Sequence, residues 1–111
     1  MTEDEFINRL KVYVLVRKDI LTEIQCGVQA AHAVAELVHD HEDPAVTDWV
    51  VNHRTLIFLS ATEKQIAEKK ELLSTFKGFK EPDLNNVETA VAFTPVTHIV
   101  GVDLFGDLKL L

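Results

Sequence analysis

The sequence is poor in the residues that interrupt or cross-link a chain. Its 111 residues include one cysteine, three prolines and four glycines. The single Cys26 excludes an internal disulfide, and the acidic stretch 1–9 lacks the positive start of a secretory signal. No apolar run approaches the roughly 18 residues of a membrane span. These absences lead us to expect a cytoplasmic protein without membrane contact.

Positive charge is also scarce. The chain has 11 Lys and Arg against 18 Asp and Glu, for a net charge of −7. A general nucleic-acid binder shows a basic face, so the total argues against that class but leaves room for a local basic patch. The length and the ordinary mixture of 47% hydrophobic and 26% charged residues predict one folded domain, 1–111. Its core is expected at about 11–95, with an apolar C-terminal extension at 96–111.

Four segments have the composition of β-strands. The runs at Lys11–Arg17, Thr55–Ala61 and Thr89–Thr94 are rich in β-branched and aromatic residues, which is typical of buried strands. The segment Phe79–Pro82 is expected to be a short edge strand, where proline is tolerated. The apolar extension is expected to pack on the domain or on a partner.

Three helices are expected between these strands. Two capping boxes, Thr22 to Gln25 and Thr62 to Gln65, predict helices at about Glu23–His39 and Glu63–Lys77, the second ended by Gly78. A third, short helix is expected to begin at Asp43-Pro44 and to direct Val46, Trp49 and Val50 inward. The order of elements predicts an α/β protein: a three-layer α/β/α sandwich on a mixed sheet of about four strands, with Lys11–Arg17 central.

A polar stripe marks the first long helix. Gln25, Gln29, His32 and Glu36 fall at i, i+4, i+7 and i+11, which places them on one helix face. The preceding strand ends in Arg17-Lys18-Asp19, at the strand end where ligands collect in open α/β sheets. The stripe is therefore expected to face either solvent or a site.

Several pieces of the sequence occur in a recognisable order. A strand ends Val16-Arg17-Lys18-Asp19-Ile20, a helix reads Val28-Gln29-Ala30-Ala31-His32-Ala33, and Trp49 and Asn52 precede the next strand. Glu81-Pro82-Asp83 and then Thr89-Ala90-Val91-Ala92 follow. Over about residues 11–95 this order resembles the type 2 peptidyl-tRNA hydrolase family, with its Arg-x-Asp-Leu strand end and its Ala-Gln-x-x-His-Ala helix.

The resemblance implies a hydrolase that cleaves the ester between tRNA and a peptide or N-blocked amino acid. It implies no metal or organic cofactor, and a homodimer. Water is the expected nucleophile, because the helix face offers no activated Ser or Cys pair. Four residues would position the water and the ester: Gln29, His32, Asp83 and Thr89. Arg17, Lys18 and Gln25 would bind the substrate. Arg17 and Lys18 would hold its phosphates, and Gln25 stands where the family has a lysine.

Each of these assignments has an alternative. Glu81 competes with Asp83 for the acidic position, and Asp83 can equally be a turn residue. His32 can be a packed helix residue, Thr89 an ordinary strand residue, and Arg17 and Lys18 ordinary surface charges. The missing lysine and the acidic total favour a second function class, a binding or regulatory module that has the fold without hydrolysis.

A metal site and a reactive thiol are both disfavoured. Glu36, His39 and His41 invite a metal assignment, but the Glu-x-x-His spacing occurs once, whereas di-metal carboxylate sites need it on two helices. No metal is therefore expected. Cys26 has no catalytic partner in the sequence and is expected to be a buried thiol.

Overall fold

The sheet of this protein has five strands and is mixed. A computed structural model describes residues 1–39 and 42–111, with the strand order β3-β4-β1-β2-β5. The strands are β1 (Lys11–Val16), β2 (Thr55–Ser60), β3 (Phe76–Glu81), β4 (Val87–Phe93) and β5 (Lys109–Leu110). β1 is parallel to β2, and the other neighbouring pairs are antiparallel. Every residue of β1 is buried, as its continuous apolar run predicts.

Five α-helices accompany the sheet. They are α1 (Glu3–Asn8), α2 (Glu23–His39), α3 (Pro44–Asp48), α4 (Glu63–Leu72) and α5 (His98–Phe105). A π-helical turn, η1 (Trp49–His53), follows α3, and a 3-10 turn, η2 (Pro82–Leu84), follows β3. The predicted helix starts are confirmed. Capping boxes open α2 and α4, and the Asp43 side chain caps α3 by accepting from the backbone N–H of Ala45.

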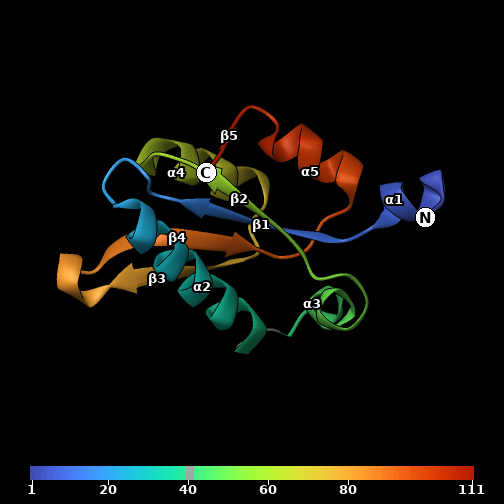
Figure 1. The fold of residues 1–111 in the computed structure, drawn as a ribbon, viewed down its shortest axis with the longest axis horizontal. Coiled ribbons are helices and arrows are strands. Elements are labelled where there is room, and N and C mark those ends of the chain that lie inside the picture. Colours follow the sequence, from blue (N-terminus) through green and yellow to red (C-terminus); the bar gives the residue numbers. More distant parts are fainter. Residues whose placement is uncertain (40–41) are drawn as a thin grey trace.

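Helices pack on both faces of the sheet. Side chains alternate along β1, so Val12, Val14 and Val16 join a core with α2, α3 and η1. Tyr13 and Leu15 point the other way, into a core that includes residues of α4 and α5. Figure 1 shows α2 and α3 on one side of the strands and α4 and α5 on the other.

The second long helix is shorter than predicted. It ends at Leu72, five residues before the expected Lys77, and Gly78 lies inside β3 instead of ending the helix. Leu72, the last residue of α4, is 62% exposed. The helix cannot continue because residues from Phe76 onward pair with β4 as a strand. The Phe76 ring also packs on the Phe93 ring, with centroids 5.6 Å apart.

The C-terminal extension packs on its own domain. It forms α5 and the two-residue β5, which adds a fifth strand beside β2. Phe105 and Leu108 are buried against the sheet. The outer side of this extension is apolar and exposed at Ile99, Val100, Val102 and Leu110. In the ranges 1–39 and 42–111, no helix has the length and apolar character needed to cross a bilayer.

Candidate functional site

A β-bulge shapes the part of the sheet that lies under α2. In the ladder between β3 and β4, Phe79 is opposite Ala90 whereas Lys80 is opposite Glu88, so Thr89 has no partner in β3. A bulge of this kind allows two consecutive side chains to face the same side. Ala90 belongs to the core under α2, and the Thr89 hydroxyl also bonds to a residue of α2.

Gln29 is the residue of α2 that accepts a hydrogen bond from the Thr89 hydroxyl. Thr89 Oγ1 donates to Gln29 Oε1 at 2.6 Å, and Gln29 Nε2 donates to Glu81 Oε2 at 2.7 Å. Gln29 is 5% exposed and Thr89 is fully buried. Since each end of the amide has a polar partner, its orientation is fixed. The structure thus brings together Gln29 and Thr89, two residues predicted for one site.

Glu81 is the carboxylate of this cluster. Its Oε1 also accepts from the backbone N–H of Asp83 at 3.1 Å. The hydrogen bond from Gln29, the one from the Asp83 backbone and the charge of His32 hold the pKa of the Glu81 carboxyl below its usual range. Asp83 contributes its backbone to this arrangement, so of the two acidic candidates Glu81 is the one in contact with Gln29.

His32 lies one helical turn after Gln29 on α2. Its ring stacks on Phe79, with ring centroids 4.3 Å apart and planes inclined by 10°. The His32 side chain is exposed, and Phe79 is half-buried. Phe79 was missed as a site residue, although its position two residues before Glu81 places both on the same face of β3.

The Gln25 side chain is part of the capping box at the start of α2. Its Oε1 accepts from the Thr22 backbone N–H at 2.9 Å, and its own N–H donates to Thr22 Oγ1 at 3.3 Å. The residue is exposed and lies one turn before Gln29. A side chain that caps its helix in this way has its acceptor already engaged.

Arg17 lies on the other face of the sheet from Gln29. It is 9% exposed and donates from Nε and Nη2 to the two carboxylate oxygens of Asp19, at 2.9 and 3.0 Å. Its side chain lines a cavity of about 400 Å³ together with Glu63 of α4. Lys18, the next residue, is exposed. The structure therefore brings Gln29 and Thr89 together but leaves the Arg17 side chain apart from them.

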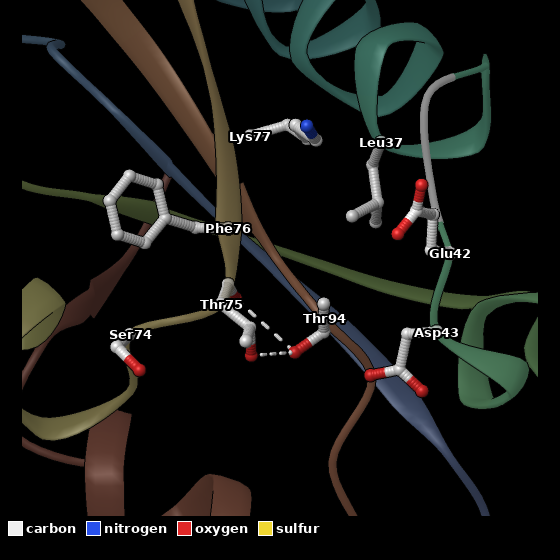
Figure 2. A pocket seen from close by; sticks show the side chains of 8 residues that line it. All are labelled: Leu37, Glu42, Asp43, Ser74, Thr75, Phe76, Lys77 and Thr94. Carbon is white, nitrogen blue, oxygen red and sulfur yellow. Dashed lines mark hydrogen bonds between the residues drawn. The ribbon is translucent and has the colours of Figure 1, made fainter.

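A separate cavity of about 520 Å³ opens near the C-terminal turn of α2. Figure 2 shows the hydroxyls of Thr75 and Thr94 bonded to each other, with the carboxylates of Glu42 and Asp43 across the cavity. The two hydroxyl oxygens are 2.6 Å apart. None of the predicted site residues lines this cavity. The candidate site is therefore the cluster of Gln29, Thr89 and Glu81.

The metal ligands considered from the sequence are only partly placed. Glu36 and His39 lie on α2, and His41 is outside the described residues. Within 1–39 and 42–111, no group of three or more His, Cys, Asp or Glu side chains is arranged to hold a metal ion. Cys26 is buried, and burial raises the pKa of its thiol.

The hydrogen bond from Gln29 should be visible in the titration of Glu81. In Gln29→Met, the pKa of the Glu81 carboxyl is expected to rise toward its ordinary value of 4.5. The folded-state pKa is lowered, so this bond stabilises the wild type above pH 4.5 and the benefit is lost as pH falls through the folded-state pKa. Carboxyl-carbon NMR measures the pKa directly. An unchanged pKa in the variant would mean that Gln29 does not bind the ionised carboxylate.

Comparison with known proteins does not supply a family for this chain. Neither a family model nor a curated protein matches its sequence.

Proposed function

We propose that this protein hydrolyses the ester that joins a peptide, or an N-blocked amino acid, to tRNA. The observation that carries the proposal is the buried Gln29 amide, held between the Thr89 hydroxyl and the Glu81 carboxylate. The sequence resemblance and this geometry agree on the same helix residue and the same strand residue.

In this proposal the nucleophile is water. Glu81 is ionised at neutral pH and retains lone pairs beyond its bonds to Gln29 and the Asp83 backbone, so it can accept a hydrogen bond from water. Water attacks the ester carbonyl carbon, the bond from that carbon to the ribose oxygen breaks, and the ribose oxygen leaves with a proton that came from the water. Because its pKa is lowered, Glu81 is a weak base. It orients the water and stabilises the positive charge that develops on it.

The remaining predicted residues have supporting roles in the proposal. Exposed Lys18 is the better phosphate ligand, because the Arg17 guanidinium is already bonded to Asp19. Asp83 supports Glu81 through its backbone. No metal or organic cofactor takes part. We also propose a homodimer through the exposed apolar side of α5, a three-layer α/β/α arrangement of the domain, and a cytoplasmic location.

One observation favours the alternative, a binding or regulatory module without hydrolysis. Gln25 stands in the place of the family lysine, and its side chain caps α2 instead of offering a cation to the site. A fixed positive charge there would meet a phosphate or a developing oxyanion. A neutral amide provides weaker hydrogen bonds than an ammonium group.

Gln25→Lys tests the two functions against each other in a turnover assay with N-acetyl-aminoacyl-tRNA. The variant is expected to hydrolyse the substrate faster than the wild type and to show a steeper salt dependence, because it adds a cation one turn from Gln29. It also loses the side-chain half of a capping box, so a small loss of stability, about 0.5–1 kcal/mol, should accompany the gain.

The matched control is Gln65→Lys, which makes the same change in the capping box of α4, far from the site in sequence and on the other face of the sheet. It should alter stability without altering turnover. If neither the wild type nor Gln25→Lys cleaves the ester, hydrolysis is wrong and the module takes its place.

A further inference from the structure

Two contacts between α2 and β3 follow one another along the chain. Gln29 bonds to Glu81, and His32 stacks on Phe79. Phe79 and Glu81 are two residues apart on β3, so their side chains point to the same face at a separation of about 7 Å. The His32 ring therefore lies directly beside the polar cluster that we propose binds the ester.

The His32 ring is held in a defined plane. One of its faces lies on Phe79 with the planes only 10° apart, and the side chain is exposed to solvent. A solvent-exposed ring that is supported on one face is an arrangement with which proteins bind an unpaired nucleobase by stacking. The stacking contact itself uses the ring face and needs no positive charge at that position.

We infer that His32 binds the substrate by stacking against the 3′-terminal adenine of the tRNA, an inference that rests on the proposed function. The ester is attached to the ribose of that same nucleotide. A base stacked on His32 places its ribose toward Gln29 and Glu81, the neighbouring contact between α2 and β3. His32 is then a residue that determines the substrate class, an RNA end with an unpaired purine, and it is not the general base.

The two roles of an imidazole use different parts of the ring. A general base accepts a proton on a nitrogen lone pair in the ring plane, whereas stacking uses the ring face. Phenylalanine has the face without the nitrogens. His32→Phe therefore separates the roles, and His32→Ala removes both.

The experiment measures binding and turnover separately on the full chain. The binding probe is a short RNA ending in CCA with 2-aminopurine as the terminal base, whose fluorescence reports stacking. The same RNA with an abasic last nucleotide is the reference. His32→Ala should weaken binding of the first RNA by about 5- to 150-fold and leave the second unchanged. His32→Phe should restore both binding and KM to near the wild-type values.

The matched control is His39→Ala, another exposed histidine two turns further along α2, which should bind both RNAs like the wild type. The inference is overturned if His32→Phe loses kcat as completely as His32→Ala while binding is unchanged, because that result assigns the general base to His32. It is also overturned if the wild type does not distinguish the two RNAs.

Failure of the proposed function gives a different pattern. If the wild type binds the adenine-ended RNA through His32 but does not cleave N-acetyl-aminoacyl-tRNA, then stacking is supported and hydrolysis fails. If it cleaves the ester while His32→Ala binds both RNAs normally, then hydrolysis is supported and the stacking inference fails.

Discussion

Gln29→Met is expected to lower the turnover of N-acetyl-aminoacyl-tRNA by about 10²- to 10³-fold, the loss typical of removing a positioned polar group from an active site. Methionine has nearly the same length and volume as glutamine but forms no comparable hydrogen bonds. The change leaves the fully buried Thr89 hydroxyl with only its 3.4 Å bond to the Phe79 carbonyl, and Glu81 loses its side-chain donor. Initial rates at saturating substrate measure the effect.

Stability has to be separated from activity in this experiment. A buried hydroxyl that loses its partner costs about 1–3 kcal/mol, so the fraction of folded variant should be checked by circular dichroism at the assay temperature. Gln65→Met makes the same substitution on α4 and should leave kcat unchanged. Thr89→Ser, which retains the hydroxyl, should retain most of the activity, whereas Thr89→Val should not. If Gln29→Met turned over the substrate at the wild-type rate, Gln29 would not be a residue of the active site.

Gly101→Ala is expected to lower the free energy of unfolding by about 1–3 kcal/mol, the cost of overpacking a close-packed core. A Cβ atom at residue 101 would lie 2.3 to 2.5 Å from three atoms of the Tyr13 side chain, the hydroxyl oxygen and two ring carbons. The ring cannot retreat easily, since it is 5% exposed and stacks on Phe105 with centroids 4.7 Å apart. The midpoint of urea unfolding, monitored by the fluorescence of Trp49, measures the change.

A second helical glycine provides the control for this variant. Gly27 in α2 has no atom within 4 Å of the position of an added Cβ. Gly27→Ala should therefore stabilise the protein by about 0.5–1 kcal/mol, because alanine loses less backbone entropy in a helix than glycine does. The two variants should move the unfolding midpoint in opposite directions. Equal shifts of the same sign would show that helix propensity, and not contact with Tyr13, governs Gly101.

The elements with a local signal could be predicted from the sequence. The bounds of α2 match the prediction, because its capping box and its helical periodicity agree. The end of α4 could not be predicted, because Leu72, Leu73 and Phe76 also fit a helical face. The choice between helix and strand at Phe76 depends on pairing with β4, which is contact with a distant part of the chain.

The candidate site could be predicted only in part, because Phe79 was missed and Glu81 was only an alternative to Asp83. Gln29 and Thr89 do meet, as expected. Simple alternation along β4 would have put Thr89 on the opposite face from Ala90, and no local pattern announces the bulge that prevents this. The position of Arg17 could have been predicted from the alternation of side chains along β1. This alternation places its side chain with Tyr13 and Leu15, on the face that α4 covers.

The bulge at Thr89 interrupts the pairing of β3 with β4 and also supplies the hydroxyl that bonds to Gln29. A chain that lacked this one residue would pair β3 and β4 without interruption, because the pair Phe79–Ala90 would be followed directly by the pair Lys80–Glu88. The same shortened chain would have no hydroxyl beneath Gln29. A change that made this ladder regular would therefore remove the hydroxyl on which the proposed site depends, while leaving the order of the strands as it is.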